Sequence, residues 1–412
     1  MRRACFTIGV FLLTSTIIFS QQLPRQEQLL NGLKLLIWED RLANKMTVKV
    51  RIHKGAAFDL KDKEGMMALL SDILFADGQS EKLFREDFAG KLDVTVNYDY
   101  IQIDALGKTE NFLAMLEILA NSLINPPITK ENFKKVYEAR LAKIENLEKK
   151  DSYVADLAVR KRLLGTFPYG RSIEGTAQSL KNIELADLIF AKERYLTADN
   201  ATLIISGNLK SDFVYMAARR IFGPWKKSER PIPYSFRQPD EPDTSLLEMA
   251  STDDNLIEAR SALRGVARSD KNFFTAQILA RVLSERLKRE SDNSAVIHQG
   301  YFLPGILISK LSLSKASSNE EFSSEKFLPK FSLSDLMRES INTVEFEKAK
   351  SDFLKDFNAT PHYDLWLDLD TYGLVSLEEE KKKAESVSLQ DVVSLLEEFR
   401  KRPIVNVVLI KR

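Results

Sequence analysis

Strand-like and helix-like patterns of apolar residues alternate along most of this 412-residue chain. Patterns that predict strands cover residues 30–37, 46–53, 93–106 and 200–207. Patterns with a period near 3.6 residues, which predict helices, cover residues 65–75, 111–123, 129–150, 154–164 and 187–195. Within 93–106 the alternation shifts by one residue, which predicts a bulge or a tight turn near Asp99-Tyr100. The first half is therefore expected to form a sheet packed against helices.

A proline-rich segment without clear periodicity follows this half. Residues 226–243 hold four of the chain's 13 prolines, and we interpret residues 226–245 as a linker between domains at 21–225 and 246–412. Beyond the linker, the patterns predict helices at 273–287, 344–357 and 389–399, a strand pair at 301–312, an exposed loop at 314–326 and a final strand at 404–410. The second half thus repeats the order of the first half in a shorter form.

The N-terminus has the layout of a secretory signal peptide. Arg2 and Arg3 precede an apolar run from Thr7 to Phe19, so we predict a signal peptide at residues 1–20 and export to the periplasm or the extracellular space. An uncleaved anchor is the alternative, but the run is shorter than the roughly 20 residues that span a membrane. No second apolar run of that length follows, and we expect no membrane span after the signal is removed.

Charge and cysteine content argue against several classes of function. The 60 Lys and Arg residues balance 59 acidic residues, so no net field favours nucleic acid. The single cysteine, Cys5, lies in the predicted signal peptide, which leaves the mature chain without a thiol for catalysis, disulfides or metal binding. The sequence also shows no Ser-His-Asp spacing, no nucleophile elbow and no glycine loop for phosphate.

The helical segment at residues 65–75 places three residues on one stripe. Ala68, Ser71 and Asp72 stand at positions i, i+3 and i+4. Two imidazoles one turn apart on such a stripe could bind Zn²⁺, and a glutamate between them could take a proton from bound water. Ala68 has no donor atom, Ser71 is no carboxylate, and Asp72 offers only oxygen. We therefore interpret the segment as a buried packing helix.

The frame of this segment resembles the His-x-x-Glu-His helix of the inverzincins, zinc metallopeptidases of the pitrilysin/insulinase family. Gly65 and Leu74-Phe75 match the frame, whereas Ala68 and Asp72 stand at the two histidine positions and Ser71 at the glutamate position. Other landmarks keep the family's order along the chain: Asn31-Gly32-Leu33, Asn125-Pro126, Pro168-Tyr169-Gly170, Gly175-Thr176 and Asn200-Ala201-Thr202. The chain is identified as a degenerate, non-catalytic member of this family.

The resemblance implies an α+β fold of two tandem metallopeptidase-like α/β halves, each an antiparallel-rich sheet packed against helices, with the second half shortened. It also implies a third zinc ligand, a glutamate some seventy residues after the motif, for which Glu145 and Glu148 are candidates as vestigial ligands. Both lie on a charge-rich helix, where a solvated face is the simpler explanation. Asp72 with either glutamate would bind at most a hard cation weakly, so we expect no metal and no cofactor.

Two further features weaken a catalytic reading. Family members carry an Arg-Gly-Leu-Ala-Tyr-like segment in the second half whose Arg and Tyr help to hold the substrate, and residues 294–298 contain no such pair. The three histidines, His53, His298 and His362, lie far apart in the sequence and lack a second histidine at ligand spacing, so we interpret each as a surface or loop residue.

These observations lead to one hypothesis and two alternatives. The hypothesis is an exported, catalytically inactive pitrilysin/insulinase-like protein that acts as a partner subunit of a zinc-bearing homologue. The first alternative is a metallopeptidase with an unusual metal site. The second is a stand-alone protein that binds unstructured peptides or acts as a scaffold.

Overall fold

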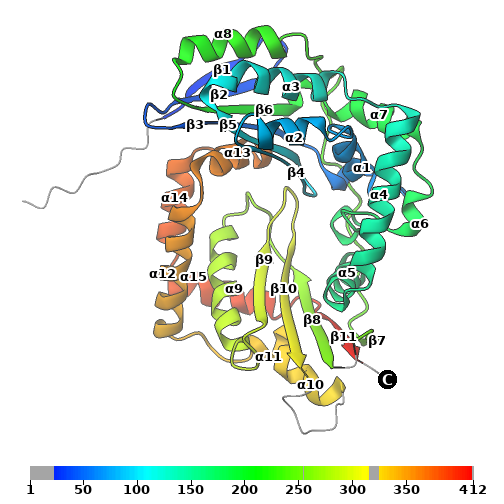
Figure 1. Cartoon of the computed structure of the whole chain (residues 1–412). Helices are drawn as coiled ribbons and strands as arrows, with labels where there is room; N and C mark the ends of the chain where they lie inside the picture. The colour runs from blue at the N-terminus through cyan, green and yellow to red at the C-terminus, as the bar shows by residue number, and fades with distance from the viewer. Residues whose placement is uncertain (1–22, 254, 315–323, 411–412) are drawn as a thin grey trace, which may run out of the picture.

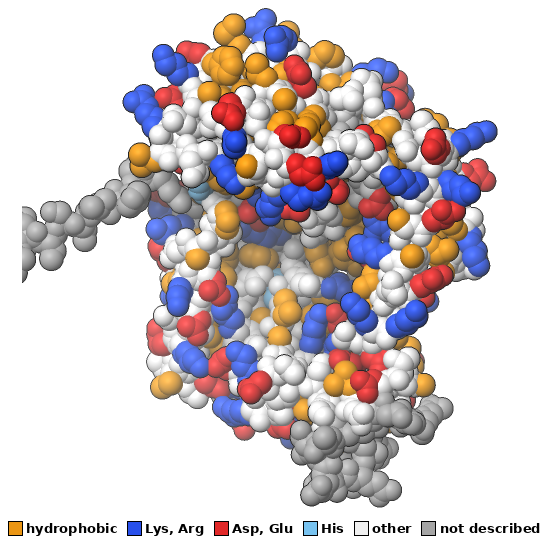
Figure 2. Space-filling view, viewed as in Figure 1, with side chains coloured by type: hydrophobic (Ala, Val, Ile, Leu, Met, Phe, Trp, Pro, Cys, Tyr) orange, Lys and Arg blue, Asp and Glu red, His pale blue; other side chains and the backbone are white. Residues whose placement is uncertain are grey.

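The computed structural model describes residues 23–410, except for residue 254 and residues 315–323. The predicted signal peptide and most of the predicted loop at 314–326 lie outside the described residues. Figure 1 shows two halves, each with one sheet and its own helices, and Figure 2 shows the visible face of the molecule hollowed between them. In the described part of the chain, no helix is long and apolar enough to cross a membrane.

Six strands of the first half form one sheet. They are β1 (Arg25–Gln28), β2 (Lys34–Glu39), β3 (Lys45–Ile52), β4 (Lys91–Val96), β5 (Ile101–Lys108) and β6 (Ala201–Gly207). Their order in the sheet is β1-β2-β6-β3-β5-β4. Neighbouring strands run antiparallel except for the parallel pair β2 and β6. Every residue of β6 is buried, which explains why its sequence is a continuous apolar run rather than an alternation.

Five strands of the second half repeat this arrangement. They are β7 (Leu246–Ala250), β8 (Leu256–Arg264), β9 (Ser294–Gln299), β10 (Ile306–Ser314) and β11 (Val405–Ile410). Their order is β7-β11-β8-β10-β9, with β7 and β11 parallel and the other neighbours antiparallel. This order matches β2-β6-β3-β5-β4 strand for strand, and β1 has no counterpart among the described residues. The predicted fold of two tandem halves with a shortened second half is confirmed.

Helices cover the sheets and connect their strands. In the first half they are α1 (Met66–Ile73), α2 (Gln79–Glu86), α3 (Phe112–Ile124), α4 (Lys130–Glu148), α5 (Asp151–Leu164), α6 (Ala177–Leu180), α7 (Leu185–Tyr195) and α8 (Ser211–Phe222). In the second half they are α9 (Phe273–Leu287), α10 (Ser324–Phe331), α11 (Leu333–Leu336), α12 (Thr343–Ala359), α13 (His362–Tyr372), α14 (Leu377–Ser386) and α15 (Leu389–Phe399). Since α9 follows β8 as α1 follows β3, these two helices hold equivalent places in the repeat.

The structure decides between the two readings of the Asp99-Tyr100 shift and corrects one strand prediction. A tight turn is present, because β4 and β5 pair antiparallel on either side of it. The strand pair predicted at 301–312 is wrong, since β9 ends at Gln299 and Tyr301 lies in the loop before β10. In β9 Val296 and the polar His298 are buried on one face while the apolar Ile297 is exposed on the other, so polarity alone does not predict the buried face of this strand.

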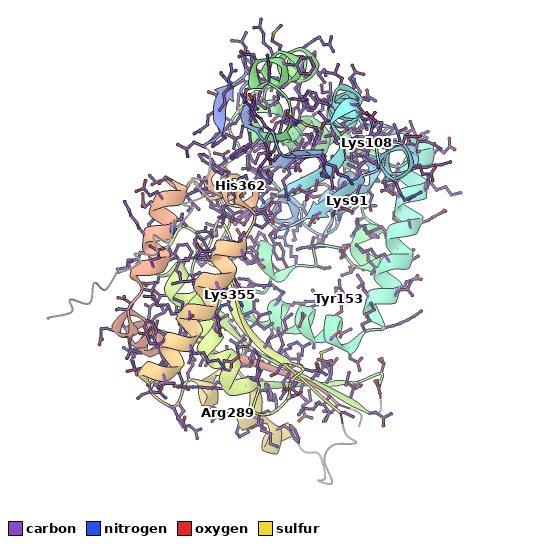
Figure 3. The ribbon with its side chains drawn as sticks, turned by 60° about the vertical axis from the view of Figure 1, so that its left-hand side comes forward. Lys91, Lys108, Tyr153, Arg289, Lys355 and His362 are labelled. Carbon is purple, nitrogen blue, oxygen red and sulfur yellow. The ribbon has the colours of Figure 1, made fainter. Side chains whose placement is uncertain are left out.

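Each half provides one helix to the sheet of the other half. Helix α5 of the first half packs on β8 and β11 of the second. Helix α13 of the second half packs on the first sheet, where Leu367 joins a cluster with Leu36, Trp38 and Ile204. Figure 1 shows α13 directly beneath the first sheet, and Figure 3 shows His362, at its start, where the halves meet. The two halves are therefore held together by buried surface as well as by the chain.

Polar side chains fix the position of α13 along β3. Every second residue at the end of β3, and the residue just after the strand, bonds to α13. Their partners on α13 lie about one helical turn apart. The pairs are Lys49 with Asp364 (2.8 Å), Arg51 with Asp368 (2.7 Å) and His53 with Thr371 (3.1 Å). Arg51 is only 3% exposed and also donates to Gln102 at 2.8 Å. This match of spacing sets one register between the halves.

His298 corrects the prediction that all three histidines lie on the surface or in loops. Its side chain is 3% exposed within β9, and its Nε2 accepts a hydrogen bond from the Val266 N–H at 3.2 Å. Burial lowers the pKa of His298 to about 3, so the imidazole is neutral in the folded protein. The sequence pattern misled because a neutral histidine packs as a core residue once its nitrogens have partners.

Mild acid is expected to destabilise the protein through His298. The unfolded histidine takes up a proton near pH 6.5 and the folded one near pH 3, so the free energy of unfolding falls as the pH drops through this window. At pH 5 the loss from this residue is about 2 kcal/mol. Urea unfolding at pH 7 and pH 5 measures it, with His298→Gln as the comparison. If the variant loses as much stability as the natural protein between these pH values, His298 is not the cause.

Candidate functional site

The helix that carries the stripe starts at a capped and buried end. Gly65 precedes α1, and the Asp59 carboxylate accepts hydrogen bonds from the N–H groups of Gly65 and Met67, both at 2.7 Å. These groups would otherwise lack partners at a helix start. Burial raises the pKa of Asp59 to about 8, and the two backbone N–H groups act against this shift. Asp59 therefore fixes where α1 begins.

Two glycines bring a distant segment against this helix start. A Cβ on Gly65 would lie 2.7 Å from the Glu174 carbonyl oxygen, and one on Gly175 would lie 2.5 Å from the Glu64 carbonyl oxygen. Both glycines also have positive φ, at +92° and +85°. Only glycine allows this contact. The contact places Glu174 beside the start of α1.

The stripe predicted from the sequence is present. Ala68 and Ser71 are buried, and the Asp72 side chain is 35% exposed. The Ser71 hydroxyl donates to the Ala68 carbonyl at 2.7 Å, within the helix itself. The stripe therefore presents one carboxylate and no nitrogen ligand. The four residues Leu69, Leu70, Ile73 and Leu74 are buried in the first core, as expected of a packing helix.

Arg140 of α4 occupies the space in front of the stripe. Its Nε and Nη2 donate to Asp72 Oδ2 at 2.8 and 2.6 Å, Nη2 also donates to the Ala68 carbonyl at 3.1 Å, and Nη1 donates to Glu174. Lys143, one turn along α4, pairs with Glu174 at 2.8 Å. Burial raises the pKa of the Asp72 carboxyl, and the Arg140 guanidinium opposes that shift. The carboxylates at this position are thus bound to cations of the chain.

A hollow of about 410 Å³ adjoins these residues, bounded by α1, α2, β4 and α4. Its lining includes Asp72, Lys135, Arg140 and Lys143. The Lys135 Nζ donates to the Ala76 carbonyl at 2.5 Å. The hollow therefore has more cationic than anionic side chains, the opposite of what a site for a metal cation requires.

Glu145 and Glu148, the candidates for a vestigial ligand, lie elsewhere on α4. Both side chains are exposed, and neither lines the hollow beside Asp72. The sequence carried a signal for Arg140, because Val136, Arg140 and Ile144 follow helical spacing as the buried stripe of α4. An arginine within an apolar stripe indicates a buried charge that needs a partner.

These residues do not fit the zinc that the motif's family implies. A catalytic zinc takes three protein ligands, usually with nitrogen among them. Here Asp72 and Glu174 supply oxygen alone, and both carboxylates already bind Arg140. Among residues 23–410 as far as the structure describes them, no group of three or more His, Cys, Asp or Glu side chains is placed to hold a metal ion. No step of zinc chemistry follows from this geometry.

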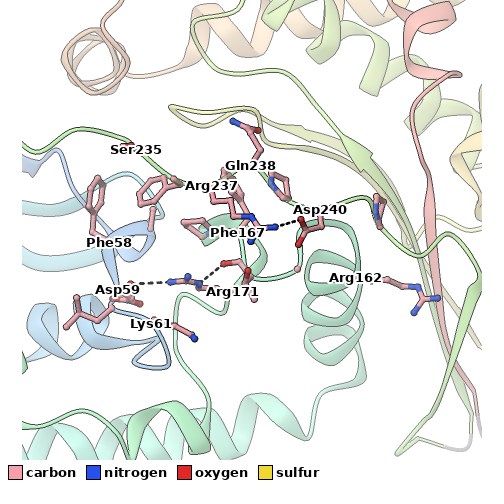
Figure 4. A pocket seen from close by; sticks show the side chains of 18 of the residues that line it. Phe58, Asp59, Lys61, Arg162, Phe167, Arg171, Ser235, Arg237, Gln238 and Asp240 are labelled. Atoms are coloured by element: carbon pink, nitrogen blue, oxygen red, sulfur yellow. Dashed lines mark hydrogen bonds and ion pairs between the residues drawn. The ribbon is translucent and has the colours of Figure 1, made fainter.

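A second hollow, of about 500 Å³, lies under the linker. Aromatic side chains of Phe58, Phe167 and Phe236 line it. Figure 4 shows Arg171 and Arg237 beside it, with Arg237 paired to Asp240 at 2.8 Å. Arg171 donates to the backbone carbonyl of Asp59 at 3.2 Å and of Thr166 at 3.1 Å. Arg171 thus holds two loops together, whereas the Arg237 pair lies within the linker and is exposed, so we assign the candidate site to α1.

Two family models match this chain. One is Insulinase (Peptidase family M16), over residues 35–177, and the other is the Peptidase M16 inactive domain, over residues 182–304. The chain is 23% identical over 275 residues to the probable mitochondrial-processing peptidase subunit beta of Arabidopsis thaliana, covering 65% of this chain and 51% of the relative. It is 22% identical over 211 residues to an uncharacterized zinc protease of Rickettsia felis, covering 49% and 50%. The chain thus spans about half the length of the curated relatives it matches.

Solved structures share the fold. A protease from Helicobacter pylori matches with a TM-score of 0.83 at 16% identity, covering 94% of this chain and all of that one. A peptidase M16 inactive domain from Pseudomonas fluorescens matches with a TM-score of 0.80 at 17% identity, covering 94% of this chain and 98% of that one. The periplasmic protease PqqL from Escherichia coli matches with a TM-score of 0.71 at 12% identity, covering 94% of this chain and 48% of that one. Together, the two family models span most of the chain, and the chain belongs to peptidase family M16, the pitrilysin/insulinase family.

Proposed function

We propose that this protein is an exported, non-catalytic M16 homologue that acts as the partner subunit of a zinc-bearing homologue. The observation that carries the proposal is helix α1, which keeps the family's frame while Arg140 binds the one carboxylate on its stripe. A peptidase of this family needs an activated water and a general base at this position. The Asp72 carboxylate is ion-paired and the Ser71 hydroxyl donates within the helix, so neither is free for that role.

The comparison with longer and shorter M16 proteins supports a role as a subunit. It covers nearly all of two structures of M16 proteins and 48% of the PqqL chain, so PqqL is about twice as long. The part of PqqL that this chain does not cover is about as long as the part that it does, and we infer that this chain pairs with a second unit of similar size. The Arabidopsis relative is itself named as a subunit. If one chain of such a pair binds zinc, the other needs to keep only its fold and its contact surface.

The predicted signal peptide at residues 1–20 supports export, and the periplasmic location in the name of PqqL agrees with it. Detection of the mature protein in a periplasmic or culture fraction, with an N-terminus near residue 21, would test this part of the proposal. Recovery of the full-length chain in the cytoplasm would contradict it.

The purified mature protein is expected to hold no stoichiometric zinc and to cleave no unstructured peptide, because the site offers two ion-paired carboxylates and no imidazole. Elemental analysis after gel filtration without chelator measures the zinc content, and a fluorogenic peptide assay with and without chelator measures the cleavage. A homologue with an intact His-x-x-Glu-His motif serves as the positive control. One tightly held zinc per chain would point instead to an unusual metal site.

Mixing with that homologue tests the partnership. If the proposal is right, the two proteins form a complex that buries at least ~1,000 Å² in total, and the peptidase activity of the homologue rises. Size-exclusion chromatography with light scattering reports the complex, and the peptide assay on each protein and on the mixture reports activity. Independent elution at micromolar concentration with unchanged activity would count against a subunit role, and binding of the unstructured peptide by this chain alone would then favour a stand-alone peptide-binding protein.

A further inference from the structure

The stripe position contains a fixed positive charge that belongs to the chain. The Arg140 guanidinium binds Asp72 and the Ala68 carbonyl on α1 and also binds Glu174 in the segment before α6. It therefore joins α1, α4 and a third segment at one buried point. We infer that Arg140 takes the place of a metal cation here, as the positive centre that the carboxylates require and as the group that excludes a metal.

The geometry supports the statement that Arg140 is the positive centre that the carboxylates require. Arg140 is 5% exposed, and both of its carboxylate partners are less exposed than a free surface residue, at 35% for Asp72 and 26% for Glu174. Two carboxylates directed at one point repel each other unless a cation lies between them. A planar guanidinium has five N–H donors and stays charged at all relevant pH values, so it can bind both.

The charges around Arg140 support the statement that it excludes a metal ion. Lys143 lies one turn further along α4 and pairs with Glu174, which adds a second positive charge on the same side. A metal ion approaching Asp72 would have to displace one cation and remain beside another. Histidines at positions 68 and 72 would supply ligands but would leave this positive charge in place. The inference concerns this position alone and does not depend on the existence of a partner subunit.

The first experiment installs the family's ligands with and without Arg140. The variant Ala68→His/Ser71→Glu/Asp72→His carries the His-x-x-Glu-His pattern on α1. A second variant adds Arg140→Gln to these changes. A matched control instead adds Lys134→Gln, which removes one positive charge from the same helix at a side chain that is 77% exposed. Zinc affinity is measured for each variant by competition with a chromogenic chelator.

The Arg140→Gln addition is expected to tighten zinc binding by ~10-fold or more, on the scale of other groups that adjoin metal ligands. The Lys134→Gln addition is expected to change it by less than ~2-fold, because an exposed charge is screened. Equal affinities for the two additions, or no zinc binding by either, would overturn the statement that Arg140 excludes the metal.

The second experiment keeps the natural stripe and tests whether Arg140 is the cation that Asp72 and Glu174 require. Arg140→Gln is expected to lower the melting temperature by roughly 5 °C or more, since it leaves Asp72 without its cation and Glu174 with Lys143 alone. Asp72→Asn in the Arg140→Gln background is expected to recover part of that loss, because it removes one of the two charges. If Arg140→Gln does not fold, recovery of soluble, folded protein in the double variant is the readout. A double variant no more stable than Arg140→Gln would show that Arg140 acts through packing, not as a cation.

Discussion

Replacing Arg51 by alanine is expected to lower the free energy of unfolding by about 3–5 kcal/mol, the usual cost of removing one partner from a buried ion pair. Arg51 is 3% exposed at the contact between the halves, where it donates to Asp368 at 2.7 Å and to Gln102 at 2.8 Å. Its guanidinium also lies 4.1 Å from the centre of the Tyr100 ring. The alanine variant leaves the Asp368 charge and the Gln102 amide without this partner. Urea unfolding followed by circular dichroism measures the loss.

A matched control separates this effect from a general loss of arginine. Arg85 on α2 is 68% exposed, and Arg85→Ala is expected to change stability by no more than about 0.5 kcal/mol. The Arg51→Ala variant is also expected to weaken the contact of α13, so protease cleavage near residues 360–361 should become faster. If Arg51→Ala costs less than about 1 kcal/mol, the polar contacts of α13 do not fix the register of the halves.

Replacing Leu70 by alanine is expected to destabilise the protein by about 2–5 kcal/mol. Leu70 is fully buried in the first core, and α1 packs against α4, α7 and β4. The smaller side chain loses apolar burial and leaves a cavity that close-packed neighbours fill only partly. Equilibrium unfolding in urea, with an unchanged slope against denaturant, measures the loss.

Leu42→Ala is the matched control, because Leu42 is 96% exposed and the same change there removes almost no buried surface. A loss below about 1 kcal/mol for Leu70→Ala would mean that α1 is not part of the core. The degenerate stripe would then lack the rigid frame on which the assignment of the candidate site depends.

Strong helical periodicity allowed several elements to be predicted closely. The helices expected at 273–287 and 389–399 coincide with α9 and α15, since their apolar faces lie in the core of their own half. Helix α13 was not predicted. Its acidic residues Asp364 and Asp368 are half-buried against cations of the other half, so its polar face also lies against protein. Periodicity reports burial by apolar contacts, and such a helix lacks the expected solvated face.

The candidate site, too, could be predicted from the sequence only in part. The stripe of Ala68, Ser71 and Asp72 followed from spacing within one helix, which is local information. The contact of Asp72 with Arg140 could not be predicted, because it depends on the packing of α4 on α1. The part played by Glu174 depends further on the close approach of Gly65 to residues 174–175. Glu145 and Glu148 were plausible from sequence distance, but the rotation of α4 turns them to the solvent.

The exchange of α5 and α13 between the halves determines when folding can be completed during synthesis. The surface of the first sheet at Leu36, Trp38 and Ile204 is covered by Leu367 of α13, which is made after most of the second sheet. Until residues 362–372 become available, this apolar and cationic surface has to be kept from aggregating by other means, such as a chaperone. For the same reason, a protease cut in the linker would not release two separate domains, because α5 and α13 would still hold each fragment on the sheet of the other.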